Sequence, residues 1–268
     1  MKPSTTQPAP QPAQILAPGA LRCAAVQAVI LAAGRGSRLA GAIRNRPKCL
    51  ARVGGVALIK RQLSLLAAAG IHDVAVVTGY RAADVRAAVG TRATFIHNPA
   101  WAVTNSLCSL HLCKDWVRGA FVVLNCDVLF DPRVLARLLA CEGDVFAFDS
   151  SSGAEDEQMK VELRRGCLAA IDKRLPSERV HGENVGLLYF SAAAARQLFR
   201  ETEALLRAGA TDTWLAAAVQ RLARWVPLRG VDVADLSWIE IDFPGDLERA
   251  RREIWPRIRS HWHARAAA

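Results

Sequence analysis

Two glycines and three cations stand close together after an apolar segment near the start of the chain. Residues 26–31 have the length and β-branched content of a buried parallel strand. Glycine lets the backbone turn sharply and exposes N–H groups to an approaching anion. The segment therefore predicts a binding site for a triphosphate, in which Gly34 and Gly36 form the turn and Arg35, Arg38 and Lys48 supply positive charge.

A glycine pair after a strand can also open a dinucleotide-binding unit. That fingerprint needs a third glycine where this chain has Leu39. It also needs an uninterrupted helix where residues 46–48 are Arg-Pro-Lys. The sequence therefore disfavours a dinucleotide site.

The first half of the chain alternates between apolar strand patterns and helical patterns. We expect strands at 73–78, 93–97 and 120–125, and helices at 57–69, 81–89 and 106–115. This alternation implies right-handed β-α-β crossovers and a mostly parallel sheet. Ligands of such sheets gather at the carboxyl ends of the strands, so we expect Asp127 on the same edge as the glycine loop.

The pattern changes after about residue 143. Short strands are expected at 144–148, 159–164, 167–173, 184–191 and 237–241, with a hairpin turn at 165–166. Helices are expected at 192–207, at 213–224 and from 244 to about 262. No linker-like composition separates the halves. We therefore expect one α/β domain over residues 23–268, with a small β-rich substrate-binding elaboration at about 143–235, after a disordered Pro- and Gln-rich tail at residues 1–22.

Two aspartates are candidate ligands of Mg²⁺, which binds phosphates through one or two protein carboxylates. An aspartate after a strand, such as Asp127, is often only a turn residue, but the phosphate site on the same edge favours a metal role. Asp242 ends the last predicted strand and precedes Pro244, where capping of the next helix is the competing interpretation.

Composition limits the classes of partner. The formal charge of +10 comes from scattered cations, which suits anionic small molecules and does not require nucleic acid. The seven cysteines form no C-x-x-C pair and are expected to be reduced thiols. No apolar run reaches the length of about 18 residues that spans a bilayer, and the N-terminus lacks the apolar centre of a signal peptide. A cytoplasmic location is expected.

Several segments resemble one family. Residues 31–39 (LAAGRGSRL), 46–50 (RPKCL) and 53–55 (VGG) resemble the signature loop of the nucleotidyltransferases that make NDP-sugars and CDP-alcohols. Residues 238–242 (WIEID) and 246–250 (DLERA) resemble the closing metal motif of cytidylyltransferase-like enzymes. The resemblance extends over about residues 26–252 and is closest to bacterial choline-phosphate cytidylyltransferases and related phosphonate cytidylyltransferases. It implies a Rossmann-like, GT-A-like three-layer α/β/α sandwich around a mostly parallel mixed sheet.

The resemblance also implies residue roles. It implies catalysis by Arg38, Lys48, Asp127 and Asp242, with the two aspartates holding Mg²⁺. The nucleotide is expected to contact the signature loop, namely Leu31, Ala33, Gly34, Arg35, Gly36, Ser37, Arg38 and Lys48. The acceptor is expected to contact Asn105, Ser106, Lys160, Lys173, Tyr189, Asp212 and Trp214. Aromatic faces beside a carboxylate would suit a quaternary ammonium or an amine.

The expected reaction is Mg²⁺-dependent transfer of a cytidylyl group from CTP to a small phospho-alcohol or phosphonate, of the phosphocholine or 2-aminoethylphosphonate type, with release of pyrophosphate. A sugar-1-phosphate nucleotidyltransferase that uses UTP, dTTP or GTP shares the glycine loop and stays open. A catalytically inactive homologue that senses a nucleotide is a further alternative. The sequence leaves the oligomeric state open, with a homodimer as one option.

Overall fold

The computed structural model of the chain describes residues 26–153 and 157–266. The tail expected at residues 1–22 lies outside the described residues. The elements of the first half are β1 (Gln27–Ala32), η1 (Ser37–Leu39), η2 (Lys48–Leu50), β2 (Arg52–Val53), β3 (Val56–Ala57), α1 (Leu58–Ala68), β4 (Val74–Thr78), α2 (Ala82–Val89), η3 (Gly90–Arg92), β5 (Thr94–His97), α3 (Ser106–His111) and β6 (Phe121–Asn125).

The second half adds strands on one side of the same sheet and helices on both faces. Its elements are β7 (Val128–Phe130), α4 (Pro132–Ala140), β8 (Asp144–Asp149), β9 (Lys160–Arg164), β10 (Cys167–Asp172), η4 (Ser177–Arg179), β11 (Gly182–Phe190), α5 (Ala192–Arg207), α6 (Ala216–Leu222), β12 (Leu228–Asp232), β13 (Trp238–Glu240), α7 (Pro244–Arg249), the π-helical turn η5 (Ala250–Ile254) and α8 (Trp255–Ala266).

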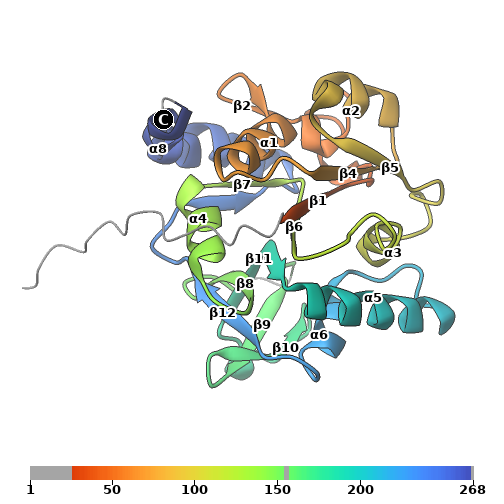
Figure 1. Cartoon of the computed structure of the whole chain (residues 1–268). Helices are drawn as coiled ribbons and strands as arrows, with labels where there is room; N and C mark the ends of the chain where they lie inside the picture. Colours follow the sequence, from red (N-terminus) through yellow and green to blue (C-terminus); the bar gives the residue numbers. More distant parts are fainter. Residues whose placement is uncertain (1–25, 154–156, 267–268) are drawn as a thin grey trace, which may run out of the picture.

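A nine-stranded mixed sheet forms the centre of the protein, with strand order β5-β4-β1-β6-β11-β8-β12-β10-β9 (Figure 1). Strands β5, β4, β1 and β6 are parallel to one another, as expected. Strand β11 runs antiparallel to both β6 and β8, and β10 runs antiparallel to β9 and β12. The strands of residues 143–235 thus extend the central sheet instead of forming a separate layer.

Both faces of the sheet are covered by helices, which confirms the expected α/β architecture (Figure 1). All six residues of β1 are buried. Because side chains alternate along a strand, Ala28 and Ile30 pack in one core cluster, whereas Val29 and Leu31 pack in another. The first cluster includes residues of α1, α2 and α4, and the second includes residues of α3, α5 and α6.

Helix α5 has the predicted bounds. Ser191 fixes its start, because the Ser191 hydroxyl accepts a hydrogen bond from the Ala194 N–H at 3.2 Å. Helix α6 begins later than the predicted residue 213. The backbone before it is bonded to the start of α3, where the N–H of Asn105 donates to the Thr211 carbonyl at 3.2 Å. This long-range contact, absent from any local pattern, keeps residues 211–213 out of the helix.

The C-terminal helices pack against the hairpin formed by β2 and β3. The Arg61 guanidinium donates to the Val53 carbonyl at 2.6 Å and lies 3.6 Å from the centre of the Trp255 ring. Arg251 donates to the Arg52 carbonyl at 3.1 Å. In the part of the chain that the structure describes, none of the helices is long and apolar enough to cross a membrane.

The hairpin turn provides a test of this packing. Gly54 has φ +55°, and a Cβ there would lie 2.3 Å from the Trp255 indole nitrogen. Gly55 has φ +78° and no atom within 4 Å of an added Cβ. We expect Gly54→Ala to lower the free energy of unfolding by about 2 to 4 kcal/mol, and Gly55→Ala by only about 1 kcal/mol. Chemical denaturation measures both, and equal losses would contradict the packing described.

Candidate active site

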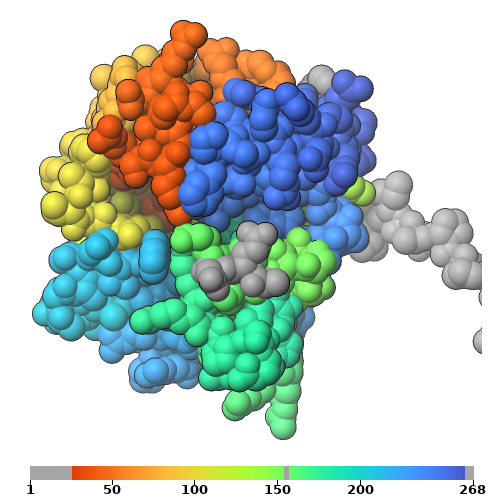
Figure 2. All heavy atoms as spheres, turned by 180° about the vertical axis from the view of Figure 1, so that it is seen from behind, coloured from red at the N-terminus to blue at the C-terminus, as the bar shows by residue number. Residues whose placement is uncertain are grey.

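A cavity of about 570 Å³ opens at the carboxyl ends of β1 and β6. In Figure 2, the early segments in red and orange and the last segment in blue form the upper part of the molecule, and green and cyan segments form the lower part. Two groups of residues line the cavity. We call the first the upper part of the site, namely Leu31, Arg38, Lys48, Asn125, Asp127, Glu240 and Asp242, and the second the lower part, which includes Glu157, Met159, Ile171, Lys173, Asn184 and Trp214.

The glycine loop brings its backbone close to Lys48. Gly36 has φ +65°, and a Cβ there would lie 2.9 Å from the Cβ of Lys48, so only glycine fits without displacing the lysine. Gly34, Arg35 and Ser37 are exposed on the loop. Arg35 lies over the Tyr80 ring at 5.6 Å and is not among the residues that line the cavity. Of the predicted loop contacts, Leu31, Arg38 and Lys48 line the cavity.

Lys48 joins the two predicted aspartates. Its Nζ lies 2.7 Å from Oδ2 of Asp127 and also donates to Oδ1 of Asp242. All three side chains are largely buried, with exposures of 12%, 16% and 19%. Burial alone would lower the pKa of Lys48, but the charges of the two carboxylates outweigh it and raise that pKa above its ordinary value. The ammonium is therefore charged and fixed between them.

Glu240, within the motif of residues 238–242, is a third carboxylate for which the sequence predicted no role. Ligand oxygens of Asp127, Glu240 and Asp242 lie within 4.8 Å of one another. Burial, and then the charges of Asp127 and Asp242, raise the pKa of Glu240 to about 8. Its position two residues before Asp242 could have suggested that both side chains lie on the same face of the strand. The pairing of β13 with β7 then places Glu240 opposite Val128, next to Asp127.

The three carboxylates suit a hard divalent cation, which prefers oxygen ligands. Oδ1 of Asp127 is buried and has no hydrogen-bond partner among the described residues. An unpartnered buried carboxylate oxygen is costly, and a cation bound there would satisfy it. The residues present therefore fit the expected metal.

Asp242 does not cap the helix that follows it. The N-cap of α7 is Phe243, and Oδ2 of Asp246 accepts from the N–H groups of Asp242 at 2.9 Å and Phe243 at 2.7 Å. The Ile241 N–H donates to the Asp127 carbonyl at 3.1 Å, which holds the two aspartates together. The capping interpretation is wrong for Asp242, whose side chain faces the cavity.

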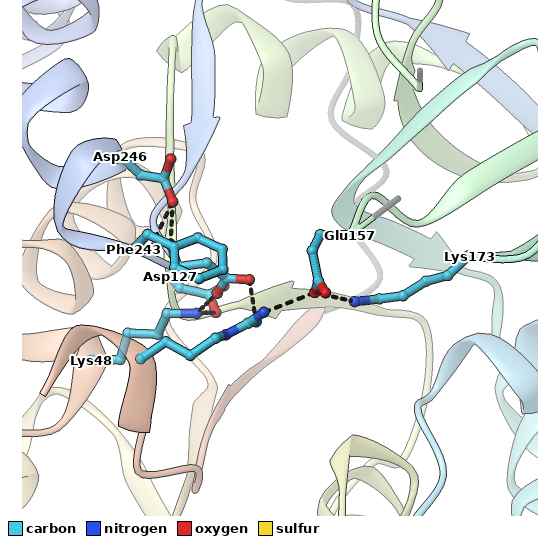
Figure 3. Close-up of polar contacts among 8 residues, drawn as sticks. Lys48, Asp127, Glu157, Lys173, Phe243 and Asp246 are labelled. Carbon is cyan, nitrogen blue, oxygen red and sulfur yellow. Dashed lines mark hydrogen bonds and ion pairs between the residues drawn. The ribbon is translucent and has the colours of Figure 1, made fainter. Parts of the chain in front are cut away.

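Glu157 connects the upper and lower parts of the site (Figure 3). Its Oε2 accepts from Arg38 at 2.8 Å and from Lys173 at 3.2 Å. Arg38 also donates to Asp242 at 2.6 Å. The hydrogen bonds from Arg38 and Lys173 lower the pKa of Glu157, so its carboxyl is charged at neutral pH. Sequence reasoning missed this residue because an exposed glutamate in an acidic run has no distinguishing pattern.

The predicted acceptor residues fall into three groups. Asn105, Ser106, Lys173 and Trp214 line the cavity. The Ser106 hydroxyl accepts from the Leu215 N–H at 2.8 Å, and the Lys173 ammonium lies 5.0 Å from the centre of the Trp214 ring. Asp212 accepts from the Asn105 amide at 3.3 Å and lines a neighbouring hollow that also contains Lys173 and Trp214.

Lys160 and Tyr189 are placed outside the cavity lining. Tyr189 is buried in the core cluster on the opposite face of β11 from Leu188, which lines the cavity. Lys160 pairs with Asp172 across β9 and β10, so it lies on the face of the sheet opposite Ile171, which lines the cavity. In both cases the alternation of side chains along the strand directs the residue away from the cavity. This direction could not be predicted without the register between the paired strands.

A mixed α/β sheet that carries a glycine loop, a buried lysine and a carboxylate cluster at one edge is the arrangement expected of a nucleotidyltransferase. The chain belongs to the MobA-like NTP transferase domain family, whose model matches residues 28–225. This confirms the family expected from the signature loop.

Two curated relatives align with most of this chain. Over 239 residues it is 34% identical to the bifunctional IPC transferase and DIPP synthase of Rubrobacter xylanophilus, covering 85% of this chain and 52% of that protein. Over 245 residues it is 29% identical to the CMP-5'-(3-aminopropyl)phosphonate synthase of Streptomyces rubellomurinus, covering 84% of this chain and 38% of that protein. The chain thus spans about half the length, or less, of these relatives.

A solved structure shares the fold. The inositol-1-phosphate CTP transferase from T. maritima superimposes with a TM-score of 0.71 at 20% identity, covering 86% of this chain and 98% of that one. The expected nucleotidyltransferase fold is confirmed.

The carboxylate cluster predicts metal binding. We expect the protein to bind Mn²⁺, a spectroscopic probe for Mg²⁺ sites, and Asp127→Asn to weaken that binding by about tenfold or more. Asp235→Asn is the control, because Asp235 pairs with Arg137 away from the cavity. Paramagnetic resonance titration measures free Mn²⁺ directly. Equal affinity in wild type and Asp127→Asn would rule out Asp127 as a ligand.

Proposed function

We propose that the protein transfers a cytidylyl group from CTP to a small phospho-alcohol or phosphonate and releases pyrophosphate, with a divalent cation, Mg²⁺, in the site. The observation that carries this proposal is the composition of one cavity. Lys48, Arg38 and three carboxylates lie on one side of it, and Lys173 beside Trp214 lies on the other. Such a cavity can hold a metal-bound triphosphate and an anionic acceptor next to each other.

The proposed reaction is an in-line displacement at the α-phosphorus. An oxygen of the acceptor phosphate forms the new P–O bond, and the bond from the α-phosphorus to the oxygen that bridges to the β-phosphate breaks. The electron pair of that bond leaves with pyrophosphate. A phosphate monoester is already largely ionised at neutral pH, so the attacking oxygen needs no general base. The protein mainly positions the reactants and stabilises charge.

The residues divide this work between them. The exposed N–H groups of the glycine loop, together with Arg38 and Lys48, are proposed to grip the nucleotide phosphates. Asp127, Glu240 and Asp242 would hold the cation, which when bound polarises the α-phosphate and neutralises the leaving pyrophosphate. Lys173 is proposed to orient the acceptor phosphate. The carboxylates of Asp127 and Asp242 raise the pKa of Lys48, so its ammonium is charged when it lies between them.

An acceptor with a cationic head group is favoured by the lower part of the cavity. The Trp214 side chain is 49% exposed, so the part of its ring that Lys173 does not cover is available to a ligand. The Asp212 carboxylate is near it in sequence and lines the same neighbouring hollow. An aromatic face and a carboxylate together bind ammonium groups by cation–π and charge attraction. The name of the aminopropylphosphonate relative points in the same direction.

The alternatives give different results in one assay panel. Mg²⁺-dependent pyrophosphate release is measured for CTP, UTP, dTTP and GTP with phosphocholine, 2-aminoethylphosphonate, inositol-1-phosphate and hexose-1-phosphates. We expect the highest kcat/KM for CTP with phosphocholine or 2-aminoethylphosphonate, and loss of activity on chelation of the metal. Turnover of hexose-1-phosphates without cytidylyl transfer would replace the proposal with a sugar nucleotidyltransferase. No turnover with any pair would favour the nucleotide-sensing homologue.

Trp214 is proposed to bind the cationic head group of the acceptor. We expect Trp214→Ala to raise KM for phosphocholine about five- to thirtyfold, because a desolvated cation–π contact contributes about 1 to 2 kcal/mol. KM for CTP should stay unchanged. Trp225→Ala is the matched control, since Trp225 is 67% exposed and is not among the cavity residues. A rise in KM for CTP as large as that for phosphocholine would contradict the assignment of Trp214 to the acceptor.

A further inference from the structure

One carboxylate oxygen lies where the two proposed substrates meet. Oε2 of Glu157 accepts hydrogen bonds from both Arg38 and Lys173. Arg38 is proposed to contact the nucleotide, and Lys173 the acceptor. Figure 3 shows the Glu157 carboxylate next to the Lys173 ammonium, on the side facing Lys48 and Asp127. A single anionic oxygen therefore bridges the cations of the two substrate sites.

We propose that the Glu157 carboxylate occupies the position of a substrate phosphate oxygen and competes with the substrates for Arg38 and Lys173. The inference rests on the proposed function for the identity of the substrates. Arginine and lysine make charge-assisted hydrogen bonds to carboxylate and to phosphate oxygens with similar geometry. Substrate binding then exchanges one anion for another at the same two cations, and Glu157 sets the affinity of the site.

The contacts of Glu157 are of a kind that a phosphate can displace. The Glu157 side chain is 59% exposed, so its carboxylate is solvated. Exposed ion pairs are weak and are screened by salt. A phosphate group carries up to two negative charges and three acceptor oxygens, so it binds the same cations more strongly. Asp127 and Asp242, at 16% and 19% exposure, are far more enclosed partners of Lys48.

Both cations keep a second contact when Glu157 leaves. Arg38 donates to Oδ2 of Asp242 at 2.6 Å and lies 4.6 Å from the centre of the Phe243 ring. Lys173 lies 5.0 Å from the centre of the Trp214 ring. These contacts hold the two side chains at the cavity independently of Glu157. Loss of the Glu157 charge therefore frees two cations that are already positioned.

The test is a comparison of phosphate binding without turnover. Calorimetry measures Kd for inorganic pyrophosphate with Mg²⁺, and for CTP with Mg²⁺ in the absence of an acceptor. Glu157→Gln keeps the size of the side chain and removes its charge. We expect this variant to bind both probes about three- to tenfold more tightly than wild type. The gain should shrink at high salt, because the charge that it removes is exposed.

Glu203→Gln is the matched control. Glu203 forms an exposed ion pair with Arg207 on α5, at 2.5 Å, and is not among the cavity residues. This variant changes the net charge by the same amount, so Kd should equal that of wild type. An equal gain in both variants would overturn the inference, because it would reflect net charge alone.

The outcomes separate this inference from the proposed function. Equal or weaker binding by Glu157→Gln would overturn the inference, and so would a lack of binding in both wild type and variant. Turnover in the substrate panel would then still support cytidylyl transfer. If no substrate pair is turned over but Glu157→Gln binds pyrophosphate more tightly than wild type, the inference holds and the proposed function fails.

Discussion

A buried ammonium between carboxylates is the interaction on which the site depends. Lys48 follows the glycine loop, Asp127 follows β6 and Asp242 follows β13, so one cation joins three distant parts of the chain. Charges removed from water are costly unless they are paired. Glu240 lies among the same groups, and three close carboxylates would repel one another without a cation. Both Lys48 and a bound metal can supply that positive charge.

The fold holds these groups together with contacts outside the cavity. The bond between Ile241 and the Asp127 carbonyl joins β13 to the turn after β6. Asp246 caps α7 and leaves the Asp242 side chain facing the cavity. Further along the same helical segment, Trp255 packs over Arg61, which bonds to the hairpin after Lys48. The C-terminal helices thus support both the carboxylate end and the lysine end of the site.

Local patterns were sufficient for the elements that carry Lys48 and Asp127. The apolar run of β1, the glycines after it and the strand before Asp127 were all predictable, because buried strands and glycine turns have strong sequence patterns. Residues 128–140 and 228–232 had no assigned element, yet they form β7, α4 and β12. Strand β12 pairs in parallel with β8, which is more than 70 residues away, so its stability comes from a partner that its own sequence does not indicate.

The sequence by itself determined the family, the α/β class and the pairing of a glycine loop with Lys48, Asp127 and Asp242. The family and the α/β class depend on residue types at short spacing, and the two aspartates were predictable because each follows a recognisable strand, and ligands gather at the carboxyl ends of strands. Only the tertiary structure decided which side chains reach the cavity. Strand register turned Lys160 and Tyr189 away from the cavity and brought Glu240 next to Asp127. Glu157 bonds to both Arg38 and Lys173, which are more than 130 residues apart, only because the fold brings their segments together. The direction of a side chain follows from pairing between distant strands, which no local pattern specifies.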